Sequence, residues 1–137
     1  MVQVILGEKG TGKTKRILDL ANSTVKTAKG SVIFIDDDNR YMFDLNHSIR
    51  FINATVYGVE SPKRLYGFLC GLAASDFDLE YVFIDRFLSI IKHDLDSLEE
   101  FFSQLDSYTK QSKITVILSV SGSAADLPPF MKGMVIV

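Results

Sequence analysis

Four short runs of consecutive apolar residues recur along the chain, and each is followed by glycine or polar residues. Continuous apolar runs of this length are typical of strands in a parallel sheet that is covered on both faces. They predict strands over residues 2–6, 31–36, 81–85 and 114–120. A further run over residues 134–137 predicts a closing strand.

Between these runs, apolar residues recur at the spacing of amphipathic helices. This pattern predicts helices over residues 15–28 and 94–110, and a third that begins at Pro62. Ser61 marks the start of this third helix, because its side-chain oxygen can accept a hydrogen bond from a free backbone N–H. Proline suits the first helical position, because the N–H that it lacks would have no partner there.

Two details of the helices lead to structural predictions. Asp96 and Ser97 each precede a glutamate by three residues, which predicts capping boxes at the start of the helix over 94–110. Gly67 and Gly71 each cost about 1 kcal/mol in a helix interior relative to alanine. Their spacing of four places them on one side of the helix, which predicts close packing against a neighbouring element.

The pattern is least regular between residues 37 and 59. Residues 49–53 partly alternate and residues 54–57 form another short run, so each is compatible with a short strand. Residues 40–45 fit either a helical turn or one arm of a hairpin. The sequence leaves these alternatives open.

Alternating strands and helices are typical of an α/β domain, in which helices cover both faces of a mainly parallel sheet. The chain has 137 residues, which suits a single domain over residues 1–137. Hydrophobic residues make up 47% of the chain and charged residues 23%, which fits a globular protein rather than a disordered one. We therefore expect a three-layer sandwich with a sheet of about five strands.

Charge and cysteine content narrow the class of protein. The net charge is −2 and lysine and arginine do not cluster, so there is no strong nucleic-acid signature. The one cysteine, Cys70, excludes an internal disulfide and is typical of a reducing compartment. No apolar run reaches the ~18 residues that span a bilayer, and the first residues lack the pattern of a signal peptide. We expect a cytoplasmic protein without a membrane span.

The stretch between the first strand and the first helix matches the pattern G-x-x-x-x-G-K-[ST] at every fixed position, which are Gly7, Gly12, Lys13 and Thr14. Glycines let successive backbone N–H groups converge on phosphate oxygens, and the following helix adds its positive dipole end. Lysine neutralises the terminal phosphates, and the threonine hydroxyl is a ligand for Mg²⁺. A strand-to-helix turn that binds nothing is the alternative, but the flanking strand and helix favour a phosphate loop.

The candidate nucleotide-binding residues run from the first glycine of this loop into the helix. They are Gly7, Glu8, Lys9, Gly10, Thr11, Gly12, Lys13, Thr14 and Lys15.

Asp85 ends a buried strand, where a carboxylate is costly unless it has a partner. In a phosphate-loop protein that partner is the hydrated Mg²⁺ bound by Thr14, so Thr14 and Asp85 are the candidate metal-binding residues. The alternative interpretation is an aspartate that caps a helix over residues 86–91. Asp36 ends a similar strand and is the rival metal acid. The later strand is favoured because the strand after the phosphate-loop helix usually lies away from the loop.

The loop GEKGTGKT, the strand YVFID and the later strand ILSVS resemble the additional-strand (RecA/AAA-like) division of P-loop NTPases. The chain is most similar to small stand-alone ATP-binding proteins of Gram-positive bacteria that carry the label twitching-motility-type ATPases. This resemblance implies a sheet order of 5-1-4-3-2, a Walker A loop at residues 7–14 and a Walker B acid at Asp85. It also implies a polar sensor of the γ-phosphate at Ser119 or Ser121, so the candidate catalytic residues are Lys13, Asp85 and Ser119.

The chain departs from the family beside Asp85, where Arg86 replaces the usual catalytic glutamate. Loss of general-base help typically lowers a rate by ~10²–10⁴-fold, which predicts slow hydrolysis. A carboxylate from residues 36–38 is the candidate substitute, and a solvated acidic loop is the alternative. For Arg86 itself the ordinary interpretation is an exposed arginine at a helix start, with an arginine finger acting in trans as the alternative.

These features predict an ATP-binding protein with weak Mg²⁺-dependent NTPase activity. One alternative is a nucleotide-gated protein-binding module without useful turnover, in which ATP orders residues 37–59 for an unknown protein partner. Another is a small-molecule kinase of the nucleoside type. No guanine-reading Asn/Thr-Lys-x-Asp motif occurs, so ATP is the expected nucleotide and Mg²⁺ its metal. The oligomeric state does not follow from the sequence.

Overall fold

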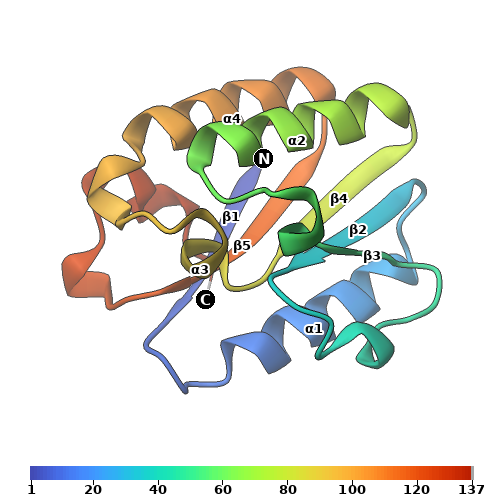
Figure 1. Cartoon of the computed structure of the whole chain (residues 1–137), viewed down its shortest axis with the longest axis horizontal. Coiled ribbons are helices and arrows are strands. Elements are labelled where there is room, and N and C mark those ends of the chain that lie inside the picture. Colours follow the sequence, from blue (N-terminus) through green and yellow to red (C-terminus); the bar gives the residue numbers. More distant parts are fainter. Residues whose placement is uncertain (137) are drawn as a thin grey trace.

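A parallel sheet forms the middle of the protein, as the computed structural model shows for residues 1–136 (Figure 1). Within these residues the sheet has five strands in the order β1-β5-β4-β2-β3, and every neighbouring pair is parallel. The strands are β1 (Val2–Gly7), β2 (Ser31–Asp36), β3 (Arg50–Asn53), β4 (Leu79–Ile84) and β5 (Thr115–Ser121).

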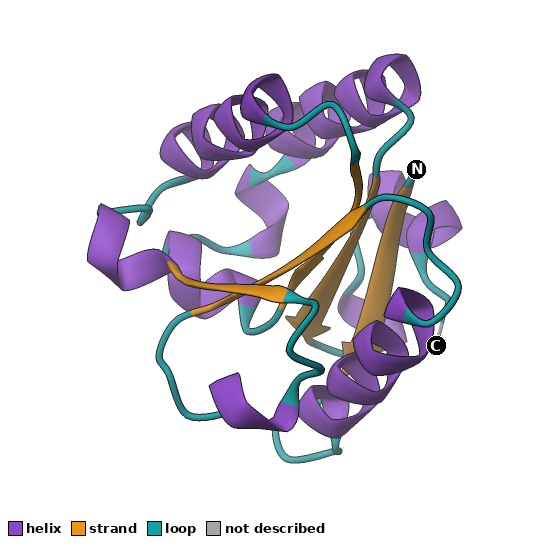
Figure 2. Ribbon diagram, turned by 90° about the vertical axis from the view of Figure 1, so that its right-hand side faces the viewer, coloured by secondary structure: helices purple, strands orange, loops and turns teal. Residues whose placement is uncertain are grey.

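Helices cover both faces of the sheet (Figure 2). The helix that follows the glycine loop packs on one face, and the other three pack on the opposite face. They are α1 (Lys13–Val25), α2 (Pro62–Ser75), α3 (Phe87–Ile91) and α4 (Glu99–Ser112). The expected three-layer α/β sandwich is therefore confirmed.

The expected strand order is close to the observed one. The four principal runs form β1, β2, β4 and β5, and their relative order is the one that the resemblance implies. The differences lie at the two edges of the sheet. At one edge β3 adds a strand beside β2, and at the other the C-terminal run makes only a single parallel bridge between Val4 and Val135.

The prediction of a closing strand over residues 134–137 is therefore wrong for the described residues, and Val137 lies outside them. Met134, the start of the predicted run, instead ends a 3₁₀ helix, η5 (Pro129–Met134). The chain still reaches the sheet, because the N–H of Ile136 donates to the carbonyl of Val4 at 2.9 Å.

The start of α2 agrees with its predicted cap, whereas the start of α4 does not. The Ser61 oxygen accepts a hydrogen bond from the N–H of Arg64. Before α4, a 3₁₀ helix η3 (Leu95–Ser97) replaces the predicted first turn, and Leu98 stands at the N-cap without a side-chain cap. The predicted capping boxes are absent because the Ser97 hydroxyl donates to the carbonyl of Asp94 and because the fully buried Leu98 fixes the entry to the helix.

The prediction for Gly67 and Gly71 is also wrong. Both are exposed on the outer side of α2, and a Cβ added to either would meet no atom within 4 Å. Neither glycine is needed for close packing within this chain.

The irregular segment forms short elements around β3. Residues 40–45 contain a 3₁₀ turn, η1 (Met42–Asp44), rather than a hairpin arm. Residues 54–57 form a 3₁₀ helix, η2 (Ala54–Tyr57), rather than a strand. The Asn53 side chain explains this change, since its oxygen accepts hydrogen bonds from both the N–H and the hydroxyl of Thr55 and so starts a helical turn.

The core has one apolar cluster on each face of the sheet. On the α1 face, the rings of Phe51, Phe34 and Phe83 lie in register across β3, β2 and β4, with centroids 6.4 Å apart at each step. The larger cluster lies under α2, α3 and α4. Among the described residues, no helix combines the length and apolar character needed to cross a membrane.

Candidate nucleotide-binding site

The glycine loop lies at the carboxyl end of β1, and its backbone geometry favours glycine at two positions. Gly10 and Gly12 have φ angles of 82° and 83°, in the left-handed region that favours glycine. A Cβ on Gly7 would lie 2.6 Å from the Thr11 hydroxyl oxygen. The loop is closed by Thr11, whose N–H and hydroxyl both donate to the carbonyl of Glu8.

The N-terminus of α1 is open to the loop. Gly12 is its N-cap and supplies no side-chain cap, and the first turn holds no acidic residue. The free N–H groups of this turn and the helix dipole therefore favour an anion at this point.

The lysines of the loop region differ in orientation. The Lys13 ammonium folds back and donates to the carbonyl of Glu8 at 2.9 Å. Burial lowers its pKa, while the nearby Asp85 carboxylate acts in the opposite direction. Lys15 is exposed and pairs with Asp19 one turn along α1, and Lys9 is exposed at the tip of the loop.

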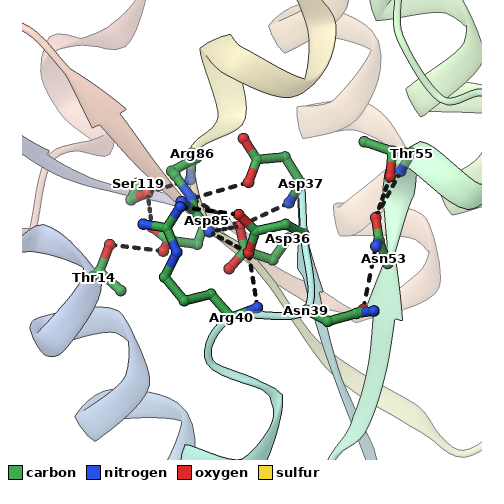
Figure 3. A network of polar contacts seen from close by, with 11 residues as sticks. Thr14, Asp36, Asp37, Asn39, Arg40, Asn53, Thr55, Asp85, Arg86 and Ser119 are labelled. Atoms are coloured by element: carbon green, nitrogen blue, oxygen red, sulfur yellow. Dashed lines mark hydrogen bonds and ion pairs between the residues drawn. The ribbon is translucent and has the colours of Figure 1, made fainter.

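Thr14, Asp85 and Ser119 are brought together from α1, the end of β4 and β5 (Figure 3). The Thr14 hydroxyl donates to Asp85 Oδ2 at 2.9 Å, and the Ser119 hydroxyl donates to Asp85 Oδ1. Asp85 is 1% exposed, and its N–H donates to the carbonyl of Ile35 on β2. The carboxylate is thus fixed by two hydroxyls beside the loop, and it does not cap α3.

A pocket of about 430 Å³ lies between the glycine loop and the segment that follows β4. Its walls bring together most of the residues that the sequence singled out, together with the start of α3. They are Lys9, Gly10, Gly12, Lys13, Thr14, Asp85, Arg86, Phe87, Leu88, Ser89, Ser119 and Ser121. Of the predicted nucleotide-binding residues, Gly7, Glu8, Thr11 and Lys15 do not line it.

Arg86 is the N-cap residue of α3, but its side chain is not the exposed helix-start arginine that the sequence favoured. The residue has a φ of 53°, and its side chain is only 23% exposed. The guanidinium contacts Asp36 Oδ1 at 2.9 Å through Nη2 and at 3.0 Å through Nε. Asp37 and Asp38 lie within ion-pair distance, each at 3.1 Å.

Asp36, the rival metal acid, is therefore engaged by an arginine rather than by Thr14. It is fully buried at the end of β2, and its Oδ1 also accepts the N–H of Asp37. Its other oxygen, Oδ2, is buried and has no hydrogen-bond partner among the described residues. The arrangement separates the two strand-ending acids, with Asp85 facing the loop and Asp36 facing Arg86.

The environment shifts the pKa values of this ion pair. Burial raises the pKa of Asp36 to about 6, although Arg86 and the Asp37 N–H oppose the change. Burial acts against the charge of Arg86, but its contacts with Asp36, Asp37 and Asp38 outweigh this and raise the pKa of the guanidinium.

The raised pKa of Asp36 predicts a pH-dependent difference between the native protein and Asp36→Asn. Because the pKa in the folded protein lies above the ordinary value of 3.8, Asp36 contributes stability at low pH that is lost as pH rises through about 6. Relative to Asp36→Asn, the native protein should lose at most about 3 kcal/mol of unfolding free energy between pH 4 and pH 7. Urea unfolding at several pH values measures this difference, and a constant difference would contradict the expectation.

Sequence reasoning missed the contacts that Ser119 and Arg86 make. The Ser119 hydroxyl donates to Asp85 and accepts a hydrogen bond from the N–H of Arg86 at 2.9 Å, and the contact of Ser119 or Ser121 with a γ-phosphate stays a prediction. The ion pair of Arg86 with Asp36 joins two strand ends about fifty residues apart, and only the adjacency of β2 and β4 reveals it. The sequence feature that pointed to neighbouring strand ends was the pair of similar apolar runs that end at Asp36 and Asp85.

Comparisons with known proteins show which solved structure this fold resembles. No protein-family model matches the chain, and no curated protein matches its sequence. Among solved structures, the flagellar accessory protein FlaH from Methanocaldococcus jannaschii superposes with a TM-score of 0.55 at 16% sequence identity. The chain shares the fold of this protein, with a five-stranded parallel sheet that helices cover on both faces.

The match covers 93% of this chain and 63% of FlaH, so the chain spans less than two thirds of that protein. At this level of identity the similarity concerns the fold. The function has to be argued from the site.

Proposed function

We propose that this protein binds ATP with Mg²⁺ and hydrolyses it slowly. The observation that carries the proposal is the open N-terminus of α1, which lies behind a left-handed glycine loop and beside the contact between Thr14 and Asp85. Anion-binding N–H groups and oxygen donors suited to Mg²⁺ thus meet at one end of one pocket.

The groups that would hold the nucleotide and the metal have distinct roles in this proposal. The N–H groups of the loop and of the first turn of α1 bind phosphate oxygens. Lys13 would leave the carbonyl of Glu8 and pair with the β- and γ-phosphates. Thr14 would bind the metal through its hydroxyl, and Asp85 would accept hydrogen bonds from the metal's water. Bound Mg²⁺ would supply charge neutralisation at the phosphates.

Slow hydrolysis follows from the carboxylates around the pocket. Asp85 is followed by Arg86 rather than glutamate, so the adjacent position supplies no general base. Asp36 is the substitute that we propose among residues 36–38, since it is buried at the neighbouring strand end. Its ion pair with Arg86 stabilises the carboxylate where it is and reduces its availability to a water molecule.

A nucleotide-gated module without useful turnover is the second candidate, and one set of contacts favours it. Asn39 follows the acidic residues, and its side-chain oxygen accepts a hydrogen bond from Asn53, which in turn binds Thr55 in η2. The same 3₁₀ helix carries the exposed side chains of Val56 and Tyr57. A change at the pocket could therefore alter an apolar surface about twenty residues further along the chain.

ATP as the nucleotide, a cytoplasmic location and a relation to twitching-motility-type ATPases remain parts of the proposal that rest on the sequence. The absence of a guanine-reading motif supports ATP, and the single cysteine supports a reducing compartment. The family label by itself implies no activity.

Nucleotide binding by Lys13→Ala tests the proposal. Removal of one charge-assisted contact is expected to weaken fluorescent ATP binding by about ten- to a hundredfold, because such a hydrogen bond contributes about 1.5–3 kcal/mol. Lys110→Ala is the matched control, since that lysine is exposed on α4 and pairs with Asp106.

Turnover measured in the same samples separates the candidates. Phosphate release that requires Lys13 supports the hydrolase, and Lys13-dependent binding without release supports the gated module. Phosphate transfer to added nucleosides would indicate a kinase instead. Binding that Lys13→Ala leaves unchanged, or no binding by the native protein, would overturn the proposed site.

A further inference from the structure

Arg86 lies between an acidic region and a proposed anion-binding region. One is the acidic cluster, formed by Asp36, Asp37 and Asp38, which the guanidinium contacts at 2.9–3.1 Å. The other is the proposed phosphate pocket, whose wall includes Arg86 itself. Figure 3 shows the arginine between the Thr14–Asp85–Ser119 contacts and the acidic cluster.

The backbone of Arg86 is fixed by a hydrogen bond, whereas its guanidinium contacts other side chains. Its N–H donates to the Ser119 hydroxyl, which is bound to Asp85. The guanidinium carbon lies 5.7 Å from the centre of the Tyr41 ring, a cation–π contact. Rotation about the side-chain bonds can therefore redirect the guanidinium without moving the strand end.

The charges of the acidic cluster are not balanced in the observed state. Three carboxylates face two guanidinium groups, because Asp38 also pairs with Arg40 at 3.3 Å, and Asp36 Oδ2 is buried without a hydrogen-bond partner among residues 1–136. Arg86 is therefore shared among several incomplete contacts. A phosphate offers the planar guanidinium two oxygens for one bidentate contact, at a higher charge density.

Only the terminal phosphate of a triphosphate would reach this position. A metal ion held by Thr14 and Asp85 would attract the terminal phosphate of a triphosphate to this side of the pocket. Arg86 directly follows Asp85 and lines the same wall of the pocket. A diphosphate held by the loop would leave the arginine with the acidic cluster.

We propose that Arg86 distinguishes nucleoside triphosphate from diphosphate, because its guanidinium leaves the acidic cluster to bind the terminal phosphate. This inference rests on the proposed nucleotide site. It makes Arg86 a residue that determines specificity and also releases Asp36 when a triphosphate is present. The observed ion pair then belongs to the state without a terminal phosphate.

The ratio of affinities for a non-hydrolysable ATP analogue and for ADP tests the proposal. In Arg86→Gln this ratio is expected to fall by about tenfold or more, with ADP affinity changed much less. Arg86→Lys should restore part of the ratio, because it keeps the charge but loses the bidentate geometry. A purely structural role would change both affinities together, so an unchanged ratio in Arg86→Gln would overturn the inference.

Asp38→Asn is expected to change the ratio of affinities for the ATP analogue and ADP in the opposite direction. Asp38 is 40% exposed and contacts Arg86 at 3.1 Å, so its neutralisation weakens the hold of the acidic cluster on the guanidinium. The affinity ratio should rise in the single variant, and this rise should disappear in Arg86→Gln/Asp38→Asn. A rise that persists in the double variant would indicate only general charge repulsion and would contradict the proposal.

Tyr41→Trp supplies a direct reporter, because the chain contains no tryptophan. The ATP analogue should change the fluorescence of this residue as Arg86 leaves the ring, and ADP should not. The change should be absent when Arg86→Gln is added. Equal changes with both nucleotides, or a change that survives Arg86→Gln, would count against the transfer of Arg86.

Failure of this inference is distinguishable from failure of the proposed function. If the native protein binds neither nucleotide, the nucleotide site itself is wrong. If both bind in a Lys13-dependent manner and the ratio does not depend on Arg86, the site stands and the role of Arg86 is wrong.

Discussion

Asp85→Asn is expected to lower Mg²⁺-dependent ATP turnover by about 10²–10³-fold, the typical effect of removing one group that stabilises a transition state electrostatically. The carboxylate accepts hydrogen bonds from the hydroxyls of Thr14 and Ser119 and is 1% exposed. Asparagine has nearly the same shape but only one acceptor oxygen and no charge. The metal's water would lose its anionic partner, whereas the backbone N–H groups of the phosphate loop would keep their positions.

Steady-state turnover over a range of Mg²⁺ concentrations measures this effect. Asp96→Asn is the matched control, because Asp96 is exposed in η3 and does not line the pocket, and its loss of charge is the same. Thermal unfolding of Asp85→Asn should establish that the variant is folded. Full activity in a folded Asp85→Asn protein would exclude Asp85 as the metal acid and direct attention to Asp36.

Phe34→Ala is expected to reduce the free energy of unfolding by about 3–5 kcal/mol, the range for removal of a large buried ring. Phe34 is fully buried at the centre of the row of rings across β3, β2 and β4, and it stacks against both Phe51 and Phe83. The truncation leaves a cavity under α1 that the rigid parallel strands cannot close. Urea unfolding should show a lower midpoint with a similar slope.

Phe77→Ala is the internal comparison for this measurement. Phe77 is fully exposed in the turn between α2 and β4, so the same truncation should change the unfolding free energy by less than about 0.5 kcal/mol. Comparable losses in the two variants would contradict the assignment of the core on the α1 face.

The fold and the loop could be predicted because they depend on local patterns. Parallel strands covered on both faces require unbroken apolar runs, and β1, β2, β4 and β5 each have one. The left-handed conformations at Gly10 and Gly12 could also be predicted locally, because glycine adopts such conformations at little cost.

The remainder depends on contacts between segments distant in sequence. The pairing of Arg86 with Asp36 requires β2 to lie beside β4, and no local pattern specifies which acid a given arginine will contact. Likewise, the late start of α4 reflects the burial of Leu98, and the turn at η2 reflects a single side chain, Asn53. In each case a tertiary or side-chain contact outweighed the local preference on which the prediction rested.

The position of β1 in the sheet determines when the site can form during synthesis. β1 has β5 as its only full strand partner among the described residues, and Met1 is tied to Ile114 and Val116 on the same side. The phosphate loop leaves the ribosome before β5, and the strand that orients it lacks its partner until residues 115–121 have been made. A nascent chain that lacks β5 carries the complete glycine motif without the strand that joins it to the sheet. The ability to hold a nucleotide therefore arises only after β5 has been made, which leaves the segments between β1 and β5 to fold without ligand.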